Sequence, residues 1–227
     1  MAFFVMYRII ETKERITADN DLEASRVRKY LKDRNVYMIN LMGSPGSGKT
    51  STLLRVIAAL KDRYNIGVME ADVDGAVDAD TIHKAGVRVI QLHSGGLCHM
   101  DADMTFRGIE SFDVEGIDLL VLENIGNLVC PAEFDVGSAR RVMILSVPEG
   151  DDKPLKYPLM FTVSDVMLIN KIDTKAVFDF DEDACRERAL KLNPDMKIFA
   201  LSAETGQGFD QFIEWLDQDI QNWRADK

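Results

Sequence analysis

The sequence predicts an α/β fold, with a mostly parallel sheet flanked by helices and a helical extension at the N-terminus. Two observations lead to this prediction. Short, continuously apolar segments recur along the chain, and a helix-like stretch follows most of them. Strands of that kind are buried on both faces, which is typical of parallel sheets. A length of 227 residues suits one large α/β domain with such an extension.

The expected elements follow in order. Residues 1–18 are expected to form an apolar arm or a short strand. Asp19, Asn20 and Asp21 then offer N-caps for a helix through about Asn35. The β-rich apolar segments are 36–42, 66–70, 87–92, 117–122, 141–147, 165–169 and 196–201, and the helix-like stretches are 49–62, 78–85, 98–111, 180–192 and 208–223. We therefore expect an N-terminal extension over residues 1–35 and a core domain over 36–227.

Composition argues against several classes of protein. Hydrophobic residues make up 46% and charged residues 29%, and Asp plus Glu outnumber Lys plus Arg by 38 to 27, which gives a net charge of -11. This balance argues against nucleic-acid binding and against a polybasic membrane binder. No apolar run approaches the roughly 20 residues of a membrane span, and no signal peptide is recognisable. Three cysteines are too few for a disulfide framework, so a soluble protein of the cytoplasm is expected.

A phosphate-binding loop is expected directly after the first core strand. The segment GSPGSGKTS, residues 43–51, fits the pattern G-x-x-x-x-G-K-[ST] between a strand and a helix. Backbone N–H groups of such a loop wrap phosphate oxygens, Lys49 reaches the β- and γ-phosphates, and the Thr50 hydroxyl binds Mg²⁺. The residues expected to contact nucleotide are Gly43, Ser44, Gly46, Ser47, Gly48, Lys49, Thr50 and Ser51.

Two further segments favour guanine as the base. Asn170, Lys171 and Asp173 stand in an N-K-x-D sequence after the strand 165–169. The Asp carboxylate of such an element accepts the N1–H and N2–H₂ donors of guanine, a donor pair that adenine lacks. Ser202 and Ala203 begin an S-A-x tripeptide of the kind that touches the guanine O6. The sequence therefore predicts GTP and GDP, rather than ATP, as ligands.

Carboxylates at two other strand ends are candidates for the reaction itself. Asp72 and Glu123 each end an apolar strand beside the phosphate-binding loop, where they can hold Mg²⁺ with Thr50 or position the attacking water. Together with Lys49 they are the expected catalytic residues. Asp74 is a further candidate, and Asp78 is either another or only a helix cap.

The segment that begins at Glu123 is predicted to be a switch loop that responds to the γ-phosphate. Glu123-Asn124-Ile125-Gly126 is an E-x-x-G variant of the D-x-x-G element, whose glycine N–H senses the γ-phosphate. No arginine finger or glutamine is evident beside it, so slow intrinsic turnover is expected.

Cys98, His99 and Cys130 lie on the same rim of the predicted sheet. Thiolate and imidazole are ligands for Ni²⁺, Zn²⁺ or copper, and a helix start near residue 98 favours the thiolate. The alternative is two buried cysteines and a solvated histidine. Three ligands leave a tetrahedral site open to water or to a second subunit. Because residues 123–130 join Glu123 to Cys130, a phosphate-driven shift of this loop can change metal affinity.

Other cysteine and histidine residues are given lesser roles. Cys185 sits at helical spacing from Ala189 and Leu190 and is expected in the core. His93 is a weaker candidate for an additional metal ligand.

These segments together resemble the hydrogenase nickel-incorporation GTPases, the HypB family. The resemblance runs from about residue 20 to the C-terminus, and its most informative segments are HSGGLCHMDADM (93–104) and LENIGNLVCPAEFDVG (122–137). It implies a P-loop GTPase of the dimerising class, whose two subunits meet face to face on binding GTP. It also implies slow GTP hydrolysis that serves nickel delivery to a [NiFe] hydrogenase large-subunit precursor, with a nickel chaperone of the HypA family as partner.

The resemblance also assigns individual residues. Cys98, His99 and Cys130 match the family's metal-binding positions at the dimer interface, and Lys153 matches a lysine that reaches the partner's nucleotide. Some relatives carry an N-terminal C-x-x-C-G-C or His-rich nickel site; residues 1–35 contain neither Cys nor His, so no such site is expected there.

Three alternatives remain open. The first is a related GTPase that serves urease or a cobalamin-dependent enzyme. The second is a metal-binding or scaffold module whose nucleotide pocket is only structural. The third is a small-molecule kinase, against which the N-K-x-D element argues.

Overall fold

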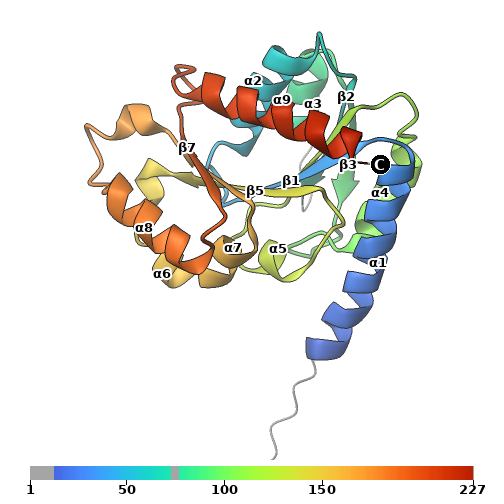
Figure 1. The fold of residues 1–227 in the computed structure, drawn as a ribbon, viewed down its shortest axis with the longest axis horizontal. Coiled ribbons are helices and arrows are strands. Elements are labelled where there is room, and N and C mark those ends of the chain that lie inside the picture. Colours follow the sequence, from blue (N-terminus) through green and yellow to red (C-terminus); the bar gives the residue numbers. More distant parts are fainter. Residues whose placement is uncertain (1–12, 73–76, 227) are drawn as a thin grey trace, which may run out of the picture.

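The computed structural model describes residues 13–72 and 77–226, which form a three-layer α/β/α arrangement (Figure 1). Its centre is one sheet of seven parallel strands in the order β3-β2-β4-β1-β5-β6-β7. The strands are β1 (Tyr37–Gly43), β2 (Ile66–Asp72), β3 (Arg88–His93), β4 (Leu119–Glu123), β5 (Arg140–Ser146), β6 (Val166–Asn170) and β7 (Lys197–Ala200). The predicted fold class is confirmed, and the seven strands lie within two or three residues of their expected positions.

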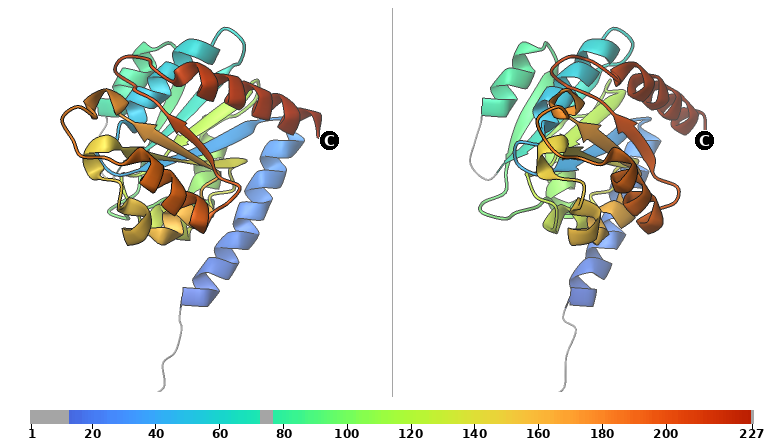
Figure 2. Two further views of the ribbon diagram at one scale, coloured as in Figure 1. Left: turned by 60° about the vertical axis from the view of Figure 1, so that its left-hand side comes forward. Right: turned by 90° about the vertical axis from the view of Figure 1, so that its left-hand side faces the viewer.

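Helices cover both faces of the sheet (Figures 1 and 2). The helices on one face are α2 (Lys49–Leu60), α3 (Val77–Lys84) and α9 (Phe209–Ala225), and those on the other are α1 (Lys13–Asp33), α4 (Ala102–Phe112), α5 (Cys130–Glu133), α6 (Lys153–Lys156), α7 (Pro158–Val163) and α8 (Glu182–Leu192). Alternate residues of a strand enter opposite cores: Ile39 packs toward α2 and α9, and Met38 packs toward α1 and α4. Burial on both faces explains the continuously apolar strands.

Helix α1 begins earlier than the sequence suggested. Residues 13–18 are helical, so the expected arm or strand is wrong for them, and Asp19–Asp21 lie inside the helix instead of capping it. The segment KERITAD is rich in helix formers and free of Gly and Pro, which explains the extension. Residues 1–12 lie outside the described part. Figures 1 and 2 show the first turns of α1 extending beyond the rest of the molecule.

Polar contacts from Asn20 and Arg28 of α1 attach this helix to the core. The Arg28 guanidinium donates to both carboxylate oxygens of Asp135 at 2.9 and 2.8 Å, and Asn20 Nδ2 donates to the Asp135 carbonyl at 2.9 Å. Asn20 Oδ1 accepts from the Ala102 N–H at the start of α4. These bonds, together with apolar packing against α4, fix the extension to the sheet domain.

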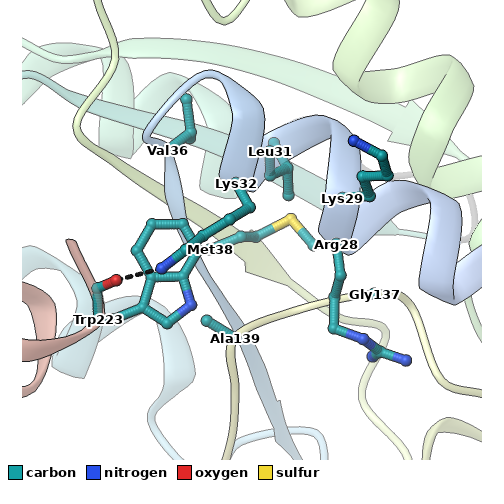
Figure 3. A pocket seen from close by; sticks show the side chains of 9 residues that line it. All are labelled: Arg28, Lys29, Leu31, Lys32, Val36, Met38, Gly137, Ala139 and Trp223. Carbon is teal, nitrogen blue, oxygen red and sulfur yellow. Dashed lines mark hydrogen bonds between the residues drawn. The ribbon is translucent and has the colours of Figure 1, made fainter. Parts of the chain in front are cut away.

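A cavity of about 280 Å³ lies between α1, β1 and the end of α9 (Figure 3). Leu31, Val36 and Met38 contribute apolar side chains to it. Lys32 also lines it, with its ammonium group over the Trp223 ring and a hydrogen bond to the Trp223 carbonyl. The cavity lies at the amino ends of the strands, opposite the phosphate-binding loop.

The structure corrects the helix boundaries that matter for the site. Helix α4 starts at Ala102 rather than 98, because the Asp101 carboxylate accepts from the Met104 N–H at 2.8 Å and caps it there. Residues 98–101 therefore form a loop. The short helices α5, α6 and α7 were not expected; each is four to six residues long and too short to show a periodic pattern. No helix in the described ranges is long and apolar enough to cross a lipid bilayer.

Candidate nucleotide and metal sites

The phosphate-binding loop lies at the carboxyl end of β1 and leads directly into α2. Two of its glycines are required by close approach of other chain segments. A Cβ on Gly43 would lie 2.7 Å from the Ile144 carbonyl oxygen, and one on Gly48 would lie 2.3 Å from Asn170 Nδ2. Gly48 also has φ +97°, a conformation that favours glycine. The tight packing holds the loop open toward the edge of the sheet, where a ligand can approach its N–H groups.

A cavity of about 590 Å³ opens in front of this loop. Lys49 lines it, and its ammonium group donates to the carbonyls of Gly43 at 3.4 Å and Ser44 at 3.2 Å. Burial lowers the pKa of Lys49 from its ordinary value, although nearby carboxylates oppose the shift. A phosphate group would offer this half-buried cation the counter-charge that the two carbonyls do not supply.

Two expected magnesium ligands contact each other in the same cavity. The Thr50 hydroxyl donates to Glu123 Oε1 at 2.8 Å, while Glu123 Oε2 is buried without a hydrogen-bond partner. Burial raises the pKa of Glu123 to about 7, against the opposing effects of Thr50 and Lys49. Asp72 and Asp78 also line the cavity, whereas Asp74 lies outside the described residues. A hydroxyl and carboxylate oxygens are the donors that Mg²⁺ prefers, so this set fits the ion.

Glu70 is a cavity residue that the sequence analysis missed. It lies in register with Glu123 on the neighbouring strand, is 4% exposed, and has one carboxylate oxygen without a hydrogen-bond partner. Burial, opposed by Gln91 and reinforced by Glu123, raises its pKa to about 7. A charged residue inside the otherwise apolar strand IGVMEAD was the available signal.

Asn170 joins the phosphate-binding loop to both expected base-binding segments. Its Nδ2 donates to the Ser47 carbonyl at 2.9 Å, and its Oδ1 accepts from the N–H groups of Lys171 at 2.8 Å and Ala203 at 3.0 Å. Lys171 Nζ donates to the Gly46 carbonyl at 2.6 Å. The three segments far apart in the sequence therefore form one connected rim.

Within that rim the expected base contacts differ in exposure. Asp173 is exposed in the 3-10 turn Ile172–Thr174, as a carboxylate that receives a ligand must be. Ser202 is buried, and its hydroxyl accepts from the Thr205 N–H. Arg55, which the sequence analysis also missed, donates from α2 to the carbonyls of Ala203 at 2.9 Å and Glu204 at 2.7 Å. Nothing in the pattern of an exposed helix arginine signalled this contact.

The structure brings Cys98, His99 and Cys130 together, with ligand atoms within 4.8 Å of one another. Cys98 Sγ lies 2.8 Å from Cys130 Sγ and 4.0 Å from His99 Nδ1. The His99 ring stacks on Phe134 at a centroid distance of 3.9 Å, and burial lowers its pKa. Two thiols and an imidazole suit Ni²⁺ or Zn²⁺. His93 is not one of this group of ligand atoms.

Two details of this site differ from expectation. Cys98 lies in a loop four residues before α4 and not at the start of that helix. Cys130 does begin a helix, α5, yet its pKa is raised, chiefly by the hydrogen bond with Cys98. Cys185 is buried in the core as expected, and burial raises its pKa to about 12.

Residues 123–130 connect the two sites. At one end, Gly126 packs against the phosphate-binding loop, where a Cβ would lie 2.9 Å from Pro45 Cγ. In the middle, the Asn127 N–H donates to the Gly43 carbonyl at 3.0 Å, and its side chain accepts from the Val129 N–H at 2.8 Å. At the other end stands Cys130. One loop therefore both contacts the phosphate-binding loop and carries a member of the thiol–imidazole cluster.

Lys153 stands apart from this chain's own nucleotide cavity. It begins α6, and its Nζ lies 5.5 Å from the centre of the Tyr157 ring. It is not among the residues that line the cavity. The structure thus does not bring Lys153 to the phosphates within one subunit.

The fold and the phosphate-binding loop define a P-loop nucleotide-binding protein. A family model described as the CobW/HypB/UreG nucleotide-binding domain matches residues 37–200. Among curated relatives, the hydrogenase maturation factor HypB of Rhizobium leguminosarum bv. viciae is 44% identical over 92% of this chain and 70% of its own length. HypB of Escherichia coli (strain K12) is 40% identical over 92% of this chain and 72% of its own length.

Solved structures of HypB proteins also resemble this chain. The crystal structure of HypB from Archaeoglobus fulgidus has a TM-score of 0.83 at 34% identity and covers 89% of this chain and 99% of its own. HypB from Helicobacter pylori in complex with nickel has a TM-score of 0.82 at 37% identity, with 92% and 99% covered. The chain belongs to the CobW/HypB/UreG family of P-loop GTPases and, within it, to the HypB hydrogenase maturation factors.

Proposed function

We propose that this protein is a GTP-hydrolysing metallochaperone that helps insert nickel into a [NiFe] hydrogenase during maturation. The observation that carries the proposal is the loop 123–130, which contacts the phosphate-binding loop at Gly126 and ends at Cys130 of the thiol–imidazole cluster. Support comes from the relatives named hydrogenase maturation factors and from the Helicobacter pylori neighbour, whose structure is of a complex with nickel.

In the proposed nucleotide site, the N–H groups of residues 43–51 and Lys49 bind the phosphates of GTP. Asp173 reads the guanine N–H donors, while the loop at Ser202 and Ala203 lies against O6. Thr50, Asp72 and Glu123 hold Mg²⁺, which neutralises charge that develops on the phosphates. The described residues that line the cavity include no arginine and no glutamine, so we propose slow intrinsic turnover.

The proposed metal site binds nickel, or zinc, as cargo through Cys98, His99 and Cys130, and a second subunit completes it. Leu97 and Val129 each immediately precede one of the cysteines and are each 48% exposed. Such apolar side chains around an incomplete ligand set favour a homodimer that forms across this rim when GTP binds. Lys153 then reaches the partner's nucleotide rather than its own.

The remaining assignments follow from the family. A nickel chaperone of the HypA family supplies the metal, and the hydrogenase large-subunit precursor receives it in the cytoplasm. Residues 1–35 act as the extension and 36–227 as the GTPase domain. Urease is a second candidate client, because the Helicobacter pylori relative, 39% identical over 91% of this chain and 86% of its own length, is named a hydrogenase/urease maturation factor.

The substitution Cys130→Ala tests whether nickel and GTP bind at different sites. Loss of one thiolate should weaken nickel binding by at least about tenfold, while GTP affinity should stay within about twofold, because Cys130 is not among the residues that line the nucleotide cavity. Isothermal titration with each ligand measures both. Cys185→Ala, which removes a core thiol, is the control and should leave nickel affinity unchanged. Unaltered nickel binding by Cys130→Ala would contradict the proposed site.

A further inference from the structure

The Cys98 and Cys130 thiols are in direct contact, with their sulfur atoms 2.8 Å apart. Two sulfurs that share a tetrahedral zinc lie about 3.8 Å apart, given metal–sulfur bonds of about 2.3 Å. Sulfurs in a disulfide are about 2.05 Å apart. The distance in this structure falls between these values, so the pair needs only a small movement to reach either arrangement.

The surroundings of the two thiols permit that movement and allow access from solvent. Cys98 is exposed, and Cys130 is half-buried. The loop that carries Cys98 contains Gly95 and Gly96, whose surroundings hold no other chain atoms within 4 Å of an added Cβ. Cys185, in contrast, is a residue of α8 and is fully buried in the core. Of the three cysteines, Cys98 and Cys130 alone are placed to react with each other.

We propose that Cys98 and Cys130 are a modification site at which a peroxide forms a reversible intramolecular disulfide. The Cys98 thiolate attacks one peroxide oxygen, so that an S–O bond forms, the O–O bond breaks and hydroxide leaves. The Cys130 thiolate then attacks the Cys98 sulfur, the S–S bond forms and the S–O bond breaks, releasing a second hydroxide. With the two thiol protons, the products are the disulfide and two waters: the cysteines lose two electrons and the peroxide gains two.

The consequence for metal transfer rests on the proposed function. The disulfide consumes both thiolates and leaves His99 as the one remaining donor of the cluster, so a bound nickel ion is released or never taken up. It also ties residues 123–130 to the Cys98 loop, which opposes any movement of that loop with the nucleotide. Peroxide would thus switch off nickel delivery, and a dithiol reductant would restore it.

Counting thiols after oxidation tests the proposal. The full-length, metal-free protein is treated with hydrogen peroxide, denatured, and assayed for free thiols and intact mass. We expect three thiols to fall to one, with a mass loss of about 2 Da from two hydrogens and a Cys98–Cys130 linked peptide. A dithiol reductant should reverse the change. Zinc-loaded protein should lose its thiols at least about tenfold more slowly, because the metal occupies both sulfurs.

Cysteine variants identify which two thiols form the disulfide. Cys185→Ala should fall from two thiols to none, and Cys98→Ser should form no intramolecular bridge. Retention of all three thiols, a bridge that includes Cys185, or a bridge between two molecules would overturn the proposal. Failure of the reduced protein to bind nickel would contradict the proposed function instead, and the thiol count would still decide whether the bridge forms.

Discussion

Asn170 shows how a single side chain organises the nucleotide site. One amide group bonds to the phosphate-binding loop at Ser47 and to the base-binding loop at Ala203. Because its oxygen and one of its N–H groups bond to the protein itself, Asn170 positions both loops, and we propose that Asp173 reads the base. The two residues differ in burial in the way this division of roles requires: Asn170 is buried, whereas Asp173 is exposed.

The Asp173→Asn substitution tests this division. A carboxamide cannot accept both guanine N–H donors, but its own N–H₂ group can donate to the extra carbonyl of xanthine. We expect GDP affinity to fall by on the order of 10²-fold or more and XDP to bind better than GDP. Competition between the two nucleotides for the variant measures this. A preference for GDP as strong as in the unaltered protein would show that Asp173 does not read the base.

Residues with a fixed motif position could be predicted from the sequence, and residues defined by three-dimensional contact could not. Lys49, Thr50 and Glu123 were found because the loop pattern and the strand ends place them at one edge of a parallel sheet. The signal for Glu70 was a carboxylate inside an apolar strand, two residues before Asp72 at its end, whereas no sequence pattern signalled Arg55. Its two hydrogen bonds depend on how α2 lies beside residues 203 and 204, about 150 residues away in the chain.

At the scale of elements, the alternation of strands and helices determined most of the fold. Buried strands such as β4 and β6 have no polar positions except at their ends, and this pattern alone locates them. The boundaries that were wrong depend on side-chain caps and tertiary contacts. Asp101 delays the start of α4, and the packing of α1 against α4 stabilises a helix that begins at Lys13.

Asp135 is the residue through which α1 is fastened, and it gives this element a predictable pH dependence. Burial alone would raise the pKa of Asp135, but Arg141, the Gly137 N–H and Arg28 together lower it below its ordinary value. A carboxyl with a lowered folded-state pKa stabilises the protein above its unfolded pKa of about 3.9. That stabilisation is lost as the pH falls through the folded-state pKa.

Replacement of Asp135 by Asn should therefore lower the free energy of unfolding at pH 7 by about 1–3 kcal/mol and weaken its dependence on pH below about 4. Urea unfolding followed by circular dichroism from pH 3 to pH 7 measures both effects. Asp33→Asn is the matched control, since the Lys29–Asp33 pair is exposed on both sides and contributes about 0.5 kcal/mol or less. Equal effects of the two substitutions would contradict the role given to Asp135.

At the scale of the whole molecule, the parallel sheet places both sites along one edge. The carboxyl ends of β1, β2, β4 and β6 surround the nucleotide cavity, and the loops after β3 and β4 carry the metal cluster. Residues 123–130 belong to both. This arrangement supports the proposed path from GTP to the metal, in which a change at the γ-phosphate displaces Gly126 and the same loop carries Cys130.

The proposed coupling requires that the nucleotide state change metal binding. The direct measurement is a nickel titration of the reduced protein, first with GDP and then with a non-hydrolysable GTP analogue, with molar mass read by light scattering on the same samples. We predict dimerisation with the analogue and a change in nickel affinity of at least about fivefold, or in nickel stoichiometry. Equal nickel binding and an unchanged molar mass in the two states would contradict the coupling of GTP to the metal site.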